Sequence, residues 1–480
     1  MARALALLCL LGCVSLNAGA ADVPTNPLVG NWAGTVHEGG DSKPFGLICV
    51  QKPGRPPAMY FTVREGNIEN LGPMYLTLQD DGYTGSAMYF HIKLHLSPDQ
   101  KQLQGALSFD GNEMPFEVTR GKLPAESTET GQGRAAKPAW TFKSGGPIWS
   151  SPAAADGAVY FSSHDGSIYA LDAKSGSQLW QFKTGGPVFG SPVVDGGALY
   201  TLSDDGYLYK LDRTTGKNLW RFDTHGGSVK REGYDRLSSR AVVADGTAYI
   251  GSADGNLYAL DAATGAERWH FATDGALRGS PAVADGRVFF GSNDGNLYAL
   301  DAAGGGLEWQ YDTLKPVVST PLVSNGMVYV GSRSANLFAF DAATGRVKWR
   351  KFYWISWVES SARIRDGVLY VGSSDYAQLF ALDAFTGREL WRFNTRGEAW
   401  PDPAVTDKLV YTGSVGYSDF PRAAGFYAVD RASGQEVWRF PMPAAPTPLG
   451  NGVNSSPAVD GGLVFFGGLD GTFYAFHTDG

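Results

Sequence analysis

The chain has 480 residues, of which 63 are glycine and 13% are aromatic, and its formal net charge is −8. This acidic balance argues against nucleic acid as a partner, and the length exceeds that of one ordinary domain. The abundance of glycine and aromatic residues favours an all-β protein rich in turns.

The N-terminal segment 1–21 has the features of a secretory signal peptide. Arg3 precedes the apolar run Ala4–Leu11, and the small residues Ala18–Ala21 supply a cleavage site. The apolar run is too short to span a bilayer. We therefore expect export to the periplasm or secretion, with no transmembrane span.

A second interpretation of this segment stays open. Leu10-Leu11-Gly12-Cys13 resembles a lipoprotein box, which would make Cys13 a lipid anchor and the chain an outer-membrane lipoprotein. Cleavage near residue 20 instead removes Cys9 and Cys13 and leaves Cys49 alone in the mature chain. We expect Cys49 to be a buried core thiol.

Residues 26–120 are expected to form a small β-barrel domain. The expected strands are Gly30–Val36, Phe45–Val50, Met59–Val63, Met74–Leu78, Ala87–Leu96, Gln104–Phe109 and Pro115–Thr119. The domain resembles the calycin-like barrels found ahead of some secreted bacterial hydrolases, through Gly30–Thr35, Gly82–Gly85, Leu103–Gly105 and Pro115–Arg120. The resemblance implies a barrel and no defined activity. The polar segment 121–138 is expected to be a flexible linker.

Eight tryptophans recur at a period near 40 residues through the region 139–480. They are Trp140, Trp180, Trp220, Trp269, Trp309, Trp349, Trp391 and Trp438. Such a period indicates an array of identical supersecondary units. Six of the eight tryptophans begin a W-x-F motif, Trp309 and Trp349 being the exceptions, and the repeat continues with S-P, with D-G pairs and with L-D-A-x-T-G.

One repeat unit, 150–183, predicts four short antiparallel strands. Asp156-Gly157, Asp165-Gly166 and Ser175-Gly176 are turn signals between apolar segments. Four strands per 40 residues predict an eight-bladed β-propeller. The last repeat stops before its tryptophan strand, whereas a spare strand, 139–142, precedes the first repeat. We expect this N-terminal strand to complete the last blade and leave no open edge.

The repeat W-x-F…S-P…G-S-x-D-G-x-L-Y-A-L-D-x-x-T-G resembles the PQQ-type propeller repeat. That repeat builds quinoprotein alcohol dehydrogenases, and it also builds the cofactor-free propeller lipoprotein of outer-membrane assembly. The resemblance covers Trp140–Phe476. It implies the fold and leaves the function open, because sites are grafted onto folds.

The repeat is irregular at one position, two residues before the serine of S-P. We expect this position to lie at the channel mouth and call its occupants the column residues. They are Trp149, Phe189, Leu237, Arg278, Val318, Glu359, Trp400 and Asn454. In blade 7, Asp402 also replaces the S-P serine. Irregular loops at 225–236, 353–357, 416–425 and 441–450 feed the same face, which predicts a binding site over blades 6–8.

Three functions remain open from the sequence, so it does not decide whether the chain is an enzyme. The first is a ligand-binding or protein-binding scaffold of the cell envelope, acting through the channel mouth on an envelope protein or a small molecule. The second is a PQQ-dependent oxidoreductase. The third is a lyase or hydrolase acting on a secreted substrate at the channel mouth, for which no catalytic spacing emerges.

The quinoprotein alternative has a defined candidate set. Arg278 and Lys315, with Lys230, would anchor the carboxylates of PQQ, and Trp149 and Trp400 would stack on its rings. Calcium would take Glu359, Asp402 and Asn454 as ligands. The quinoprotein alcohol dehydrogenases that this repeat resembles carry a vicinal cysteine pair under the cofactor, but this chain has no cysteine after Cys49.

Overall fold

The computed structural model describes residues 27–38, 41–51, 56–63, 68–79, 82–87, 90–109, 112–121, 133–228, 238–353, 356–416, 424–443 and 451–480. The chain divides into two compact units, residues 1–130 and residues 131–480. The expected signal peptide and Cys13 lie outside the described residues. In the described part, no helix has the length and apolar character needed to cross a membrane.

The first unit is a closed barrel of eight antiparallel strands, each paired with the next in the chain. The strands are β1 (Gly30–Glu38), β2 (Asp41–Val50), β3 (Ala58–Val63), β4 (Ile68–Gln79), β5 (Gly82–Ala87), β6 (Phe90–Leu96), β7 (Gln102–Phe109) and β8 (Asn112–Arg120). Pairing of β1 with β8 closes the barrel. The sequence predicted seven strands, because it gave no strand at β5 and merged its last residue with β6.

One end of the barrel is held by Trp32 and Arg120. Trp32 is fully buried and donates its indole N–H to the carbonyl of Leu28 at 2.8 Å. The guanidinium of Arg120 lies 4.3 Å from the centroid of the Trp32 ring and donates to the carbonyl of Val29 at 3.0 Å. Cys49 is buried, as expected, and this burial raises the pKa of its thiol to about 12.

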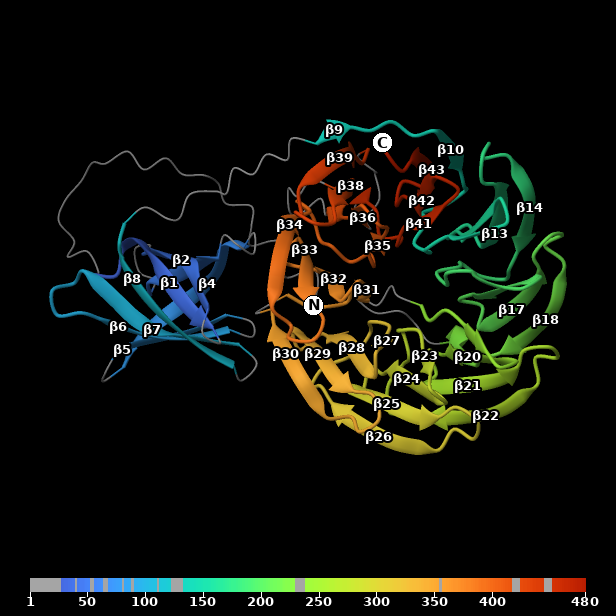
Figure 1. Cartoon of the computed structure of the whole chain (residues 1–480). Coiled ribbons are helices and arrows are strands. Elements are labelled where there is room, and N and C mark those ends of the chain that lie inside the picture. Colours follow the sequence, from blue (N-terminus) through green and yellow to red (C-terminus); the bar gives the residue numbers. More distant parts are fainter. Residues whose placement is uncertain are drawn as a thin grey trace. The chain divides into compact units, whose positions relative to one another are not determined.

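The second unit is an eight-bladed propeller, with each blade an antiparallel sheet running from the channel outward (Figure 1). Blade 1 contains β11 (Ala153–Ala155), β12 (Ala158–Ser162), β13 (Ser167–Asp172) and β14 (Gln178–Lys183). Blade 2 contains β15 (Val193–Asp195), β16 (Ala198–Leu202), β17 (Tyr207–Asp212) and β18 (Asn218–Asp223). A short 3-10 helix, η2 (Gly226–Ser228), follows. Blade 3 contains β19 (Val242–Ala244), β20 (Thr247–Gly251), β21 (Asn256–Asp261) and β22 (Glu267–Ala272).

The middle blades repeat this pattern closely. Blade 4 contains β23 (Ala282–Ala284), β24 (Arg287–Gly291), β25 (Asn296–Asp301) and β26 (Leu307–Asp312). Blade 5 contains β27 (Leu322–Ser324), β28 (Met327–Ser332), β29 (Asn336–Asp341) and β30 (Val347–Phe352). Blade 6 contains β31 (Arg363–Arg365), β32 (Val368–Ser373), β33 (Gln378–Asp383) and β34 (Glu389–Asn394).

The last two blades carry the departures from the pattern. Blade 7 contains β35 (Ala404–Val405), β36 (Leu409–Gly413), β38 (Gly425–Asp430) and β39 (Glu436–Pro441). Blade 8 contains β41 (Ala458–Asp460), β42 (Leu463–Gly467) and β43 (Thr472–His477), with β10 (Trp140–Lys143) as its outer strand. A small extra pair, β37 (Val415–Gly416) and β40 (Asn451–Gly452), joins the segments of blades 7 and 8.

Strand β10 closes the ring, which confirms the expected N-terminal closure. It pairs antiparallel with β43 over four residues, from Trp140 opposite Ala475 to Lys143 opposite Thr472. The sequence did not predict β9 (Arg134–Ala135), which adds a parallel fifth strand to the outer edge of β39. Of the expected linker, residues 133–138 therefore belong to the propeller, and residues 122–132 lie outside the described part.

Each repeat tryptophan packs against a glycine of the next blade. The pairs are Trp140–Gly176, Trp180–Gly216, Trp220–Gly265, Trp269–Gly305, Trp309–Gly345, Trp349–Gly387, Trp391–Gly434 and Trp438–Gly480. A Cβ atom at any of these glycines would lie 2.5–2.8 Å from the indole. Seven of the indoles also donate their N–H to a backbone carbonyl of the next blade. The tryptophans thus provide a repeated contact between neighbouring blades.

The aspartates of the D-G pairs serve the turns between the second and third strands. In blade 1, one carboxylate oxygen of Asp165 accepts the N–H of Ser167 at 2.8 Å, and the other accepts the hydroxyl of Tyr169 at 2.7 Å. Burial and this hydrogen bond raise the pKa of Tyr169 to about 12. The same aspartate–tyrosine bond occurs in blades 2, 3, 4 and 8.

The tryptophan–glycine contact can be separated from backbone strain by two alanine substitutions. Gly345 and Gly326 have the same positive φ, 68° and 72°, but only Gly345 faces an indole, whereas Gly326 faces open space. We expect Gly326→Ala to cost about 1 kcal/mol, from backbone strain alone. Gly345→Ala should cost about 1–3 kcal/mol more because of overpacking against Trp309. Equal denaturant midpoints for the two variants would contradict the contact.

The closure can be tested by two deletions. Removing residues 134–143 takes away β9 and β10 and leaves β43 with an open edge, so we expect a lower melting temperature or aggregation. Removing residues 23–130 takes away the barrel unit and should leave the melting transition of the propeller unchanged. Calorimetry and size-exclusion chromatography check both, and identical behaviour of the two deletions would contradict the closure.

Candidate functional site

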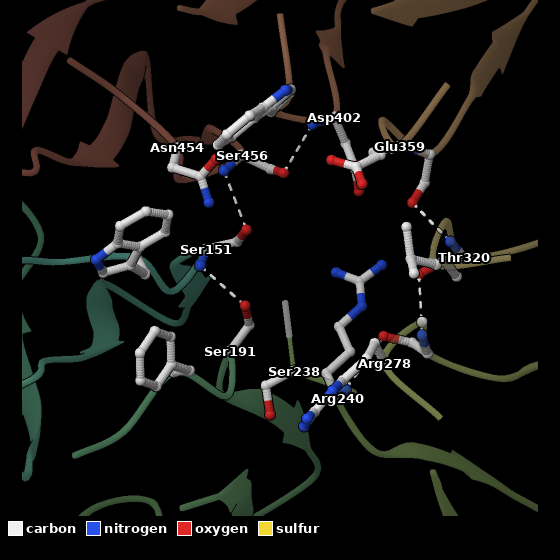
Figure 2. A pocket seen from close by; sticks show the side chains of 17 residues that line it. Ser151, Ser191, Ser238, Arg240, Arg278, Thr320, Glu359, Asp402, Asn454 and Ser456 are labelled. Atoms are coloured by element: carbon white, nitrogen blue, oxygen red, sulfur yellow. Dashed lines mark hydrogen bonds between the residues drawn. The ribbon is translucent and has the colours of Figure 1, made fainter. Parts of the chain in front are cut away.

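The inner ends of all eight blades meet around one cavity of about 70 Å³ at the channel (Figure 2). The residue at the S-P serine position of each blade lines this cavity, and we call these the ring residues. They are Ser151, Ser191, Arg240, Ser280, Thr320, Ser361, Asp402 and Ser456. Each lies two residues before the first residue of the inner strand of its blade. The regular repeat therefore places all eight at the same level of the channel.

The ring residues are joined by hydrogen bonds from blade to blade. The backbone N–H of one ring residue donates to the side-chain oxygen of the next, as from Ser151 to Ser191 at 2.9 Å and from Ser361 to Asp402 at 2.7 Å. Seven such bonds exist, with lengths of 2.7–3.3 Å. The interruption falls at Arg240, because a guanidinium has no acceptor atom.

The column residues line the same cavity, with one correction to the sequence analysis. In blade 3 the column residue is Ser238, not Leu237, which lies outside the described residues. Arginine and alanine replace S-P in this blade, and the preceding insertion hid the shift of one residue. The same error concealed Arg240, which the sequence analysis missed.

Both carboxylates of the site are held by arginines. Arg333 donates through Nε to Glu359 at 2.6 Å, and its guanidinium also lies 4.8 Å from the Trp357 ring centroid. Arg363 donates to Asp402 at 2.9 Å. The side chain of Glu359 is only 6% exposed, so this pair is largely removed from water and fixed in geometry. The sequence analysis missed both arginines, since each lies outside the column.

Aromatic side chains form the wall of the cavity on the side of blade 1. The rings of Trp149 and His164 are stacked, with centroids 5.9 Å apart, and His164 also contacts Phe189 at 3.8 Å. Trp149 is buried with Val415 of β37, and Trp400 packs against this group. The pair β37–β40 therefore supports the aromatic wall.

The structure brings together six of the seven candidates from the sequence. Trp149, Arg278, Glu359, Trp400, Asp402 and Asn454 line the cavity. The side-chain oxygen of Asn454 is buried and has no hydrogen-bond partner among the described residues. Lys315 is not a lining residue; its carbonyl accepts the hydroxyl of Thr313 at 2.9 Å in the loop before β27. Lys230 and most of the irregular loops lie outside the described part.

The residues of the cavity do not fit PQQ with calcium. The cavity measures about 70 Å³, whereas sites enclosing a drug-sized ligand measure about 300–1,000 Å³. Glu359 and Asp402, the expected metal ligands, are engaged by Arg333 and Arg363. Within the described residues, no three His, Cys, Asp or Glu side chains are grouped for a metal ion.

Solved structures with similar folds include proteins of different kinds. BamB from Moraxella catarrhalis is 20% identical with a TM-score of 0.55, over 72% of this chain and 98% of that chain. The computationally designed Ika8 protein is 18% identical with a TM-score of 0.56, over 70% and 97%. Quinohemoprotein alcohol dehydrogenase from Comamonas testosteroni is 15% identical with a TM-score of 0.57, over 72% and 77%. At these identities the likeness shows the fold alone.

The family comparison is more specific. No curated protein sequence matches the chain. One family model, described as outer membrane protein assembly factor BamB, matches residues 132–281, 253–364 and 354–480, which together cover the whole propeller. The chain belongs to this family of PQQ-like propellers.

Proposed function

We propose that the chain is an exported binding module of the cell envelope that holds a protein partner at the channel mouth. The observation that carries the proposal is the set of unlike side chains on an otherwise regular ring: the aromatic wall, the pairs Arg333–Glu359 and Arg363–Asp402, and the buried Asn454. A purely structural ring needs none of them. Aromatic and arginine side chains are those enriched at the centres of protein interfaces.

The fixed geometry supports binding over catalysis at this site. Each carboxylate already has a charged partner, so neither is poised as a general acid or base toward a substrate. Besides its bond from Arg363, Asp402 accepts the backbone N–H of Ser361 at 2.7 Å. Such preorganised polar groups, next to Trp149 and Trp400, suit recognition of a side chain inserted from a partner.

Two further observations support the cellular location and the kind of partner that we propose. The matching family is described by its part in outer-membrane protein assembly, and the first 21 residues have the features of an export signal. We propose a periplasmic location, facing the outer membrane, and a protein of the envelope as the partner. Soluble export and lipidation at Cys13 are both compatible with this role.

The proposal is tested with the double variant Glu359→Gln/Trp400→Ala. Glutamine keeps a hydrogen bond to Arg333, whereas alanine would leave a half-buried guanidinium without its carboxylate and cost up to about 3 kcal/mol. We expect recovery of the partner from envelope extract to fall at least about fivefold, since interface aromatics carry much of the binding energy. The melting temperature should change little.

The matched control is Leu307→Ala/Glu308→Ala on the outer strand of blade 4. It also removes one acid and one large apolar side chain, from a surface where Leu307 is 49% exposed and Glu308 pairs with Arg287. This control should recover the partner as the wild type does. Unchanged recovery by the channel-mouth variant would remove the site from this face, and a melting temperature raised by PQQ with calcium would instead favour a quinoprotein.

A further inference from the structure

The hydroxyl groups of the ring have a hydrogen left to donate. Ser151, Ser191, Ser280, Thr320, Ser361 and Ser456 each accept one backbone N–H from the preceding blade. A hydroxyl that accepts in this way still has its own O–H to give. In the part of the chain that the structure describes, none of these six hydroxyls donates to another residue. The ring therefore surrounds the cavity with O–H donors.

Arg240 stands in this ring where a hydroxyl would complete it. Its backbone N–H still donates to Ser280 at 3.1 Å, so the side chain alone departs from the repeat. Burial lowers the pKa of Arg240 below its usual value, nearby Arg363 lowers it further, and Asp402 opposes the shift. A guanidinium remains charged in spite of this shift. Among the described residues, none forms an ion pair with the Arg240 guanidinium.

The charges around the cavity leave an excess of cations. Arg240 and Arg278 lie on one side of the ring, and Glu359 and Asp402 lie across from them (Figure 2). Each carboxylate is matched by its own arginine, Arg333 or Arg363. Arg278 also borders a second cavity lined by Asp204. Arg240, which is half-buried, therefore has no ion-pair partner of its own among the described residues, and a partly desolvated charge of this kind is stabilised by an opposite one.

We propose that the ring is a binding site for a single oxyanion, supplied by a carboxylate of the partner. Arg240 would pair with its oxygens, and hydroxyls of the ring would donate to it. A volume of about 70 Å³ admits a small group but not a drug-sized ligand. A carboxylate side chain or a C-terminus matches the guanidinium in shape and in hydrogen-bond geometry. This inference rests on the proposed function and adds the chemistry of the group recognised.

The test uses Arg240→Ser, which restores the repeat pattern. Serine supplies the missing acceptor for the ring and removes the uncompensated cation, so the folded protein should be at least as stable without anions. Melting temperatures of the full chain are measured against acetate, inorganic phosphate and the neutral analogue acetamide at constant ionic strength. Acetate should raise the melting temperature of the wild type and acetamide should not. The affinity for acetate should fall at least about tenfold in Arg240→Ser.

A control variant and a partner assay define the outcomes. Arg213→Ser removes the same charge from a surface pair with Asp156, 2.6 Å long, and should leave the response to acetate intact. Arg240→Ser should also recover less partner from extract than Arg213→Ser does. A wild type that fails to respond to acetate, or an Arg240→Ser variant that still responds, would overturn the inference.

The same measurements separate the inference from the proposed function. Arg240-dependent stabilisation by phosphate alone, with unchanged partner recovery, assigns the site to a free anion and overturns the partner's carboxylate as its ligand. A second outcome is that Glu359→Gln/Trp400→Ala recovers less partner, whereas Arg240→Ser binds acetate and the partner as the wild type does. This outcome supports the proposed function and contradicts the oxyanion site. If both variants recover the partner as the wild type does, the proposed function is wrong. The response of the melting temperature to acetate then still tests whether the ring binds an oxyanion.

Discussion

The propeller depends on one contact made eight times: an indole ring lying flat on the glycine of the following blade. The contact needs a residue without a side chain for two reasons, since the glycine has a positive φ and its Cβ position is filled by the indole. The same close approach at every seam gives neighbouring blades a common spacing. In most blades the indole N–H adds a direction to the contact through its bond to a backbone carbonyl. Trp269 has no such partner among the described residues, so its indole acts at that seam by packing alone.

The site follows from this regularity. Once the outer contacts set the angle between blades, the inner strands must converge at one level, and hydrogen bonds between ring residues join them there. These bonds require a backbone N–H and one side-chain oxygen, and they place no demand on the column residues. The column is therefore free to differ from blade to blade without loss of the ring. The column residues can therefore form a binding site without weakening the fold, because the fold does not depend on them.

The sequence predicts the blades well because each local signal agrees with the others. Turn pairs such as Asp156-Gly157 have the positive φ angles that the dipeptide implies, 50° and 79°, and strands β12 and β13 lie between the predicted turns of blade 1. The column was predicted in seven blades out of eight from the register of S-P. The prediction failed at blade 3 because Arg240 replaces the serine of S-P there, and that serine was the marker used to set the register. Arg333 and Arg363 were not predictable, because an ion pair across blades leaves no periodic trace in the chain.

The closing strand has a consequence for how the protein folds. The hydroxyl of Ser144, just after β10, bonds the carbonyl of Gly471 across 327 residues of chain. Bringing such distant segments together carries a large loop-closure entropy and slows folding. Strand β10 must also wait for β43, which is nearly the last segment to be synthesised. The seven earlier seams can form between neighbours in the chain, whereas the eighth can form only when the chain is complete. The final closure is therefore a late event, during which the edge of blade 8 stays open to pairing with other chains.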